Sequence, residues 1–155
     1  MPQWEVPAVS QKSLNLCWEA CGRMLWHWRY RNDAGARGGY ARRAGAYATL
    51  DEGLTEQEMD RFYGSLGIRS LPKPGGRNVR HALNWSPVIV TSSDQVRGHA
   101  MVVAGHGSGR YTVINPCGLQ VVDFDSPGGD SCAVSSTQMS QAEIDGTLGG
   151  RIWYW

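Results

Sequence analysis

The chain has 155 residues, a length typical of one domain with its own hydrophobic core. Hydrophobic residues make up 41% of the chain and charged residues 19%, a composition that excludes a disordered polymer and favours a globular protein. A formal net charge of +1 argues against a nucleic-acid or membrane partner held by overall basic charge. We therefore expect a single domain over residues 1–155, with no nucleic-acid partner.

The sequence carries no membrane or export signal that we recognise. No apolar run approaches the ~18 residues that a membrane span needs. The opening residues, MPQWEVPAVS, lack the basic start and the apolar stretch of a secretory signal. We expect no membrane span and no Sec signal peptide, and we interpret the chain as an excised domain or as an effector delivered by a route that needs no such signal. The basic patch of Arg37, Arg42 and Arg43 is interpreted as a solvated face.

The first half, about residues 1–85, is predicted to be mainly helical. Apolar residues at steps of three and four predict a central core-facing helix over residues 17–30. Residues 32–39 read as a loop, and residues 40–50 as a short Ala-rich helix. Thr55 and Glu58 form a capping box that opens another helix, which Gly67 ends. A short helix over 77–84 precedes the change to strands.

The second half, about residues 86–155, is predicted to be mainly strands. Short apolar or β-branched runs are separated by Gly-rich turns. They are PVIV, HAMVVA, YTVI, LQVVDF and the final RIWYW. A short helix capped by Ser140 and Glu143 precedes the last run, and DSPGGDS at 125–131 reads as a loop. Helices followed by antiparallel strands predict an α+β fold.

Four cysteines lie at positions 17, 21, 117 and 132. Cys17 and Cys21 are one helical turn apart with no second close pair, which is the wrong spacing for zinc. We expect no metal and no cofactor. Cys117 and Cys132 could bridge in an oxidising compartment or remain buried thiols, and the sequence leaves both possibilities open.

The segment GHAMVVAGHGSGRYTVINP predicts a β-hairpin. With GHGSG, residues 105–109, as a five-residue loop, Ala104 faces Arg110 and His99 lies opposite Asn115. Directly opposed side chains are close enough for an Asn amide to hydrogen-bond an imidazole. A one-residue register slip would undo this pairing, and Asp123 is the substitute orienter in that case.

A thiol at a helix start, a His–Asn pair and a nearby Gln have the chemistry of a thiol-nucleophile site. The helix N-terminus and an imidazolium lower a thiol pKa and so favour the thiolate of Cys17. His99 would protonate the leaving amine. Gln11, six residues before Cys17, could donate its side-chain N–H to the oxyanion together with the Cys17 backbone N–H.

The order Gln, Cys-Trp, GHA and INP resembles the papain-like cysteine peptidases. It is most similar to the bacterial peptidases related to the plant-pathogen effector AvrRpt2 and to the double-glycine leader peptidases of bacteriocin exporters. Those proteins usually have Asp-Pro where this chain has Asn115-Pro116. The resemblance spans about residues 7–125. It implies a papain-like fold, with Gln11 in the oxyanion hole, Cys17 as nucleophile, His99 as base and acid, and Asn115 as orienter.

The resemblance implies a cysteine peptidase that cuts a target protein through an acyl-enzyme. It suggests a bacterial effector or toxin domain, cleavage after small residues such as glycine, and a cognate immunity protein as partner. Two alternatives stay open: a deamidase or transglutaminase of Gln side chains with the same Cys-His-Asn set, and a catalytically silent binding module. Trp18, next to the nucleophile, is a candidate wall of the substrate site or a packing residue. His27, His81 and His106 are interpreted as structural or solvent-facing.

Overall fold

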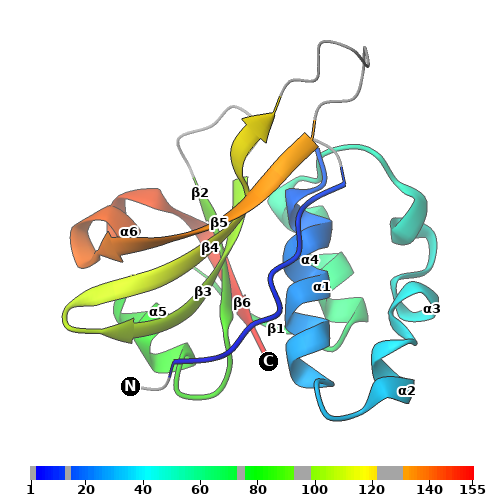
Figure 1. Cartoon of the computed structure of the whole chain (residues 1–155), viewed down its shortest axis with the longest axis horizontal. Coiled ribbons are helices and arrows are strands. Elements are labelled where there is room, and N and C mark those ends of the chain that lie inside the picture. Colours follow the sequence, from blue (N-terminus) through cyan, green and yellow to red (C-terminus); the bar gives the residue numbers. More distant parts are fainter. Residues whose placement is uncertain (1–2, 13–14, 73–75, 93–98, 122–130) are drawn as a thin grey trace.

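The structure is a computed structural model that describes residues 3–12, 15–72, 76–92, 99–121 and 131–155 (Figure 1). Side chains within these ranges are described except at 76, 92, 118–121, 131–133 and 147–148. Six α-helices and one 3-10 helix (η1) occur in these ranges: α1 Cys17–Arg29, α2 Ala34–Arg37, α3 Tyr40–Ala44, η1 Gly45–Thr49, α4 Glu56–Ser65, α5 Gly76–Ala82 and α6 Gln141–Thr147. None of the helices in the described ranges is long and apolar enough to cross a membrane.

The strands form one antiparallel sheet in the order β1-β6-β2-β3-β4-β5. Their bounds are β1 Arg69–Pro72, β2 Val88–Ser92, β3 His99–Gly107, β4 Arg110–Val121, β5 Ser131–Ser140 and β6 Leu148–Tyr154. Helices precede most of the strands along the chain, so the predicted α+β fold is confirmed. One departure is β1, which comes from the helical half and pairs with β6 at the edge of the sheet.

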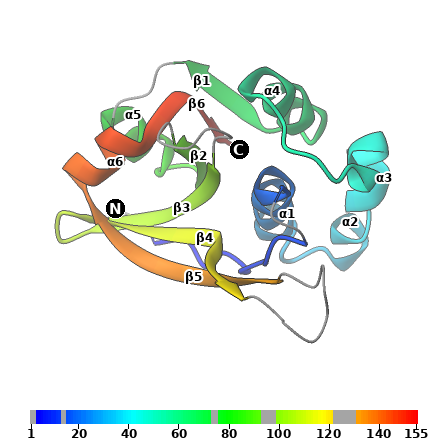
Figure 2. The same cartoon turned by 90° about the horizontal axis from the view of Figure 1, so that it is seen from above.

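Helix α1 lies between the sheet and helices α2 and α3 (Figure 2). Its apolar stripe is buried, as the periodicity predicts, and it packs on β3. Alternate residues of β3 supply the two faces of the sheet: Ala100, Val102 and Ala104 join the cluster around α1, and Met101 and Val103 join a second cluster with residues of α5 and α6. Because helices cover both faces, the middle of β3, residues 100–104, is apolar on both sides.

Local capping signals predict several helix ends correctly. The side chain of Thr55 accepts from the Glu58 N–H at 3.2 Å while Glu58 accepts from the Thr55 N–H, so the capping box is present. Ser140 and Glu143 make the same reciprocal pair at the start of α6. Helix α4 ends at Ser65, and Gly67 follows with a φ of +89°, a conformation that glycine adopts without steric cost.

The hairpin between β3 and β4 differs from the sequence prediction. Strand β3 continues to Gly107, which pairs with Arg110, so the loop has two residues instead of five. Ser108 and Gly109 both have positive φ, at 53° and 74°, as a type I′ turn requires. A register shift between Val103 and Gly105 then makes Ala104 an extra residue, a β-bulge. The predicted pairing of Ala104 with Arg110 is therefore wrong.

Candidate active site

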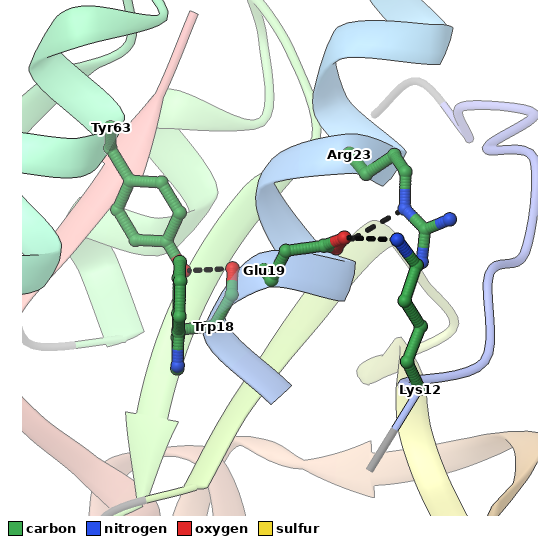
Figure 3. Close-up of polar contacts among 5 residues, drawn as sticks. All are labelled: Lys12, Trp18, Glu19, Arg23 and Tyr63. Atoms are coloured by element: carbon green, nitrogen blue, oxygen red, sulfur yellow. Dashed lines mark hydrogen bonds and ion pairs between the residues drawn. The ribbon is translucent and has the colours of Figure 1, made fainter. Parts of the chain in front are cut away.

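Cys17 is the first residue of α1, where the sequence places it. The N-cap residue is Leu16, whose side chain has no oxygen with which to accept from the N–H groups of the first turn. That turn is fixed from the side: the Tyr63 hydroxyl of α4 donates to the Trp18 carbonyl at 2.9 Å (Figure 3), and the Trp18 indole N–H donates to the Glu52 carbonyl at 2.9 Å. The thiol thus stands on a helix end that two hydrogen bonds hold in place.

The Cys17 thiol meets the start of β3. Its Sγ accepts a hydrogen bond from the backbone N–H of Ala100 at 3.4 Å. Ala100 directly follows His99 in the chain. The side chain is largely buried, with Cys17 8% exposed. Burial raises the pKa of the thiol above its usual range, and the N–H groups of Ala100, Trp18 and Cys17 itself oppose this with smaller effects. The expected lowering of the Cys17 pKa by the helix start is therefore outweighed by desolvation.

His99 and Asn115 are hydrogen-bonded, with 2.6 Å between His99 Nε2 and Asn115 Oδ1. The two residues are not directly opposed, contrary to the prediction. Past the bulge Val102 pairs with Ile114, so the register sets Asn115 beside Met101, and His99 is its diagonal neighbour on the same face. Without the bulge Asn115 would lie opposite Val102, and side chains at 99 and 102 point to opposite faces. The extra residue Ala104 thus puts His99 and Asn115 on one face.

A second hydrogen bond fixes which way the Asn115 amide points. The backbone N–H of Cys117 donates to Asn115 Oδ1 at 3.0 Å, and a backbone N–H meets only an acceptor. The atom facing His99 is therefore the carbonyl oxygen, so His99 Nε2 must carry the hydrogen of their bond. In the neutral imidazole this leaves the lone pair on Nδ1, which is the nitrogen able to take a proton from a thiol.

Gln11 lies beside β4, the strand that carries Asn115. Its backbone N–H donates to the Pro116 carbonyl at 3.2 Å, next to Asn115 in the chain, and the residue is only 5% exposed. Hydrogen bonds along β3 and β4 thus bring Cys17, His99, Asn115 and Gln11 into one region of the fold. The contribution of Ala100 and of Cys117 comes from their backbone N–H groups, which every non-proline residue has, so no sequence signal could have found it.

Other sequence candidates lie elsewhere. Trp18 is 1% exposed, and its ring packs against Phe62 and Tyr47, so it offers no surface to a substrate and belongs to the core. Asp123 lies outside the described residues. His81 is exposed on α5, and His27 lies near the far end of α1. The His106 ring contacts the Tyr111 ring at the turn end of β3. Burial lowers the pKa of His27 and of His106.

The described cysteines are in two chemical states. Cys17 and Cys21 are free thiols, and Cys117 is disulfide-bonded. The side chain of Cys132, the fourth cysteine, lies outside those described. Within the described ranges, no three His, Cys, Asp or Glu side chains gather as a metal ion would require.

The same fold occurs in peptidase domains. The peptidase domain of Streptococcus ComA, a bi-functional ABC transporter involved in quorum sensing, matches with a TM-score of 0.61 and 17% identity, over 97% of each chain. A double glycine motif protease from an AMS/PCAT transporter, solved with its leader peptide, matches with a TM-score of 0.62 and 12% identity, over 98% of this chain and 91% of that one. At these identities the likeness shows the fold alone.

The sequence itself carries the family assignment. Comparison with curated protein sequences finds no match. The sequence model of the family described as papain-like cysteine protease AvrRpt2 matches residues 2–131, most of the chain. The chain therefore belongs to the AvrRpt2 family of papain-like cysteine proteases.

Proposed function

We propose that Cys17, His99, Asn115 and Gln11 form the active site with which this cysteine peptidase hydrolyses peptide bonds of a protein substrate. Cys17 is the nucleophile and His99 the general base and acid. Asn115 orients His99, and Gln11 stabilises the oxyanion. The observation that carries this assignment is the pair of contacts at residues 99 and 100: the Ala100 N–H meets the Cys17 sulfur while the His99 ring meets Asn115.

In the first half-reaction, Cys17 Sγ attacks the carbonyl carbon of the scissile bond. Since burial favours the neutral thiol, the proton passes to His99 Nδ1 as the S–C bond forms. The substrate oxygen becomes negatively charged and accepts hydrogen bonds from the Gln11 side-chain N–H and the Cys17 backbone N–H. His99 then gives its proton to the leaving nitrogen, the C–N bond breaks, and a thioester remains on Cys17.

The second half-reaction returns the enzyme to its starting state. A water molecule attacks the thioester carbon and gives a proton to His99 Nδ1. The C–S bond breaks, the Cys17 sulfur takes the proton back from His99, and the carboxylic acid product leaves and releases its remaining proton to solvent. Throughout both steps the Nε2–H bond to Asn115 keeps the ring in the tautomer that presents Nδ1.

Mass spectrometry of a bacterial or host proteome treated with the wild-type protein tests the reaction, with Cys17→Ala as the matched control. New peptide termini that depend on Cys17 support the peptidase. A Cys17-dependent shift of about one mass unit at Gln without new termini would replace it with the deamidase, since the same thioester chemistry then acts on a side-chain amide. A biological effect that survives Cys17→Ala would replace it with the silent binding module.

We further propose that the peptidase is a bacterial effector or toxin domain, secreted or injected, that acts on a protein in the cytoplasm of a target cell and cuts after glycine. Membership of the AvrRpt2 family supports the effector role, and the structural similarity to a double glycine motif protease supports the glycine preference. A cognate immunity protein that covers the region around Cys17 and His99 is the expected partner of a toxin. Peptides differing only in Gly, Ala or Leu before the scissile bond test the preference: cleavage of the Leu peptide at the rate of the Gly peptide would contradict it.

A further inference from the structure

A buried carboxylate lies two residues after the nucleophile, and the hydrolysis described above does not use it. Glu19 is 3% exposed, in the first turn of α1. Its two oxygens face two different cations (Figure 3): Oε2 lies 3.2 Å from Arg23 Nε, and Oε1 lies 3.6 Å from Lys12 Nζ. Burying a carboxylate costs free energy unless its charge is matched. Arg23 is on the same helix, whereas Lys12 comes from another segment of the chain.

That segment is the one that carries Gln11. Lys12 follows Gln11 directly, and the Gln11 backbone N–H donates to the Pro116 carbonyl of β4. The segment is therefore held at two points: by β4 beside Asn115, and by α1 through the Lys12–Glu19 pair. Those two elements also carry the orienter and the nucleophile.

Arg23 makes Glu19 a fixed anchor. Arg23 is one helical turn away and only 20% exposed at its side chain, so it holds the carboxylate in place even where Lys12 moves. The negative charge of Glu19 also contributes, after burial, to raising the pKa of the Tyr40 hydroxyl. The Lys12 side chain, by contrast, is 60% exposed, so it can be replaced without opening the core.

We propose that Glu19 is a positioning residue that, through Lys12, holds the Gln11 segment against the start of α1 and so sets the oxyanion donor relative to the Cys17 sulfur. This rests on the role proposed above for Gln11. The Lys12–Glu19 pair affects one point of the reaction only, the stabilisation of negative charge on the substrate oxygen. It leaves the reactivity of the thiol itself unchanged.

Lys12→Met removes the cation and keeps the apolar stem, and Lys12→Arg should restore function. Since a partly exposed ion pair stabilises by up to about 1 kcal/mol, kcat for peptide hydrolysis should fall roughly five-fold in Lys12→Met with KM within about two-fold. Alkylation of Cys17 by iodoacetamide, which needs no oxyanion donor, should keep its rate. Arg61→Met, which removes a surface cation from α4, is the matched control and should change neither rate.

Coupling to Gln11 separates positioning from simple support of the helix. In a Gln11→Ala background, which alone should lower kcat roughly 10²–10³-fold, Lys12→Met should have no further effect on kcat. The same fall in kcat in both backgrounds, or a matching fall in the alkylation rate, would overturn the proposal.

The hold of the Lys12–Glu19 pair on the Gln11 segment, here called the clamp, can be tested without any turnover. The measurement is the NMR signal of the Gln11 side-chain amide, assigned with Gln11→Ala. It should shift in Lys12→Met and return in Lys12→Arg. An unmoved signal would overturn the clamp even in an active peptidase. A shifted signal in a protein that cleaves nothing would support the clamp while contradicting the proposed hydrolysis.

Discussion

At the scale of single residues, the protonation of Cys17 is the property on which the chemistry depends. The thiol has the position of a nucleophile, at a helix start with N–H groups around the sulfur. Desolvation nevertheless raises its pKa. The free protein should therefore hold a neutral thiol that passes its proton to His99 during attack, instead of a preformed thiolate.

Alkylation of Cys17 as a function of pH measures this directly. A raised pKa means that the thiolate fraction grows only at higher pH, so the rate should rise with a midpoint above the ordinary cysteine value of about 8.5. Peptide mapping separates Cys17 from Cys21, whose pKa burial also raises. A midpoint below neutral pH would contradict the prediction and indicate that an imidazolium at His99 stabilises the thiolate.

Asn115 should matter through its oxygen. Asn115→Ala removes the acceptor that sets the His99 tautomer, so we expect kcat to fall by about 10² or more, with little loss of stability because Asn115 is only half-buried. Asn115→Asp keeps an acceptor for both His99 and the Cys117 N–H and should retain most of the activity. Equal rates for Asn115→Ala and the wild type would remove Asn115 from the site.

At the scale of elements, the β3–β4 hairpin places the catalytic pair, and its turn is strained at one residue. Ser108 has a φ of 53°, in the left-handed region that costs most residues roughly 1 kcal/mol and that asparagine and glycine tolerate. Ser108→Asn, which creates the favoured Asn-Gly turn, should raise the free energy of unfolding by about 0.5–1 kcal/mol. Urea denaturation measures the change, and Ser108→Ala, which gains no such tolerance, is the control. A lower free energy of unfolding in Ser108→Asn would contradict the left-handed conformation of residue 108 in a type I′ turn.

How far the sequence predicts an element depends on whether its signal is local. The capping boxes at Thr55 and Ser140 and the stripe of α1 depend on neighbouring residues, and they were predicted correctly. Strand β5 was missed because its described side chains after residue 133 are half-buried or exposed and rich in Ser and Thr, so neither an apolar run nor a clean alternation marks it. Strand β1 is a short edge strand that the sequence shows only as a Pro-rich boundary.

The site shows the same limit. The sequence prediction contains neither the bulge at Ala104 nor the two-residue turn. Each of them moves the strand register by an odd number of residues, so together they move it by an even number, and His99 and Asn115 still share a face. The hydrogen bonds from Ala100 and Cys117 depend on where the backbone lies in three dimensions. Residue types in a sequence can indicate which chemistry is available, but the N–H groups that tune it appear only with the fold.

At the scale of the whole molecule, the cluster around α1 joins the helical half to the sheet. It contains Leu25 of α1 and Phe62 of α4 together with Ile89, Val102 and Trp153 of the central strands. Because one cluster spans both halves, we propose that residues 1–155 fold as a single domain. Far-ultraviolet circular dichroism and tryptophan fluorescence should then report one coincident unfolding transition in urea, whereas two separated transitions would contradict the single domain.

The central claim is that Cys17 is the nucleophile of peptide hydrolysis. The most direct test is the rate at which wild-type protein and Cys17→Ala cleave one peptide that contains a cleavage site found in the proteome digest. We predict cleavage by the wild type and a fall of at least about 10⁴-fold in Cys17→Ala, since that variant keeps the oxyanion donors and loses the covalent step. Cleavage by Cys17→Ala within about tenfold of the wild-type rate would contradict the account.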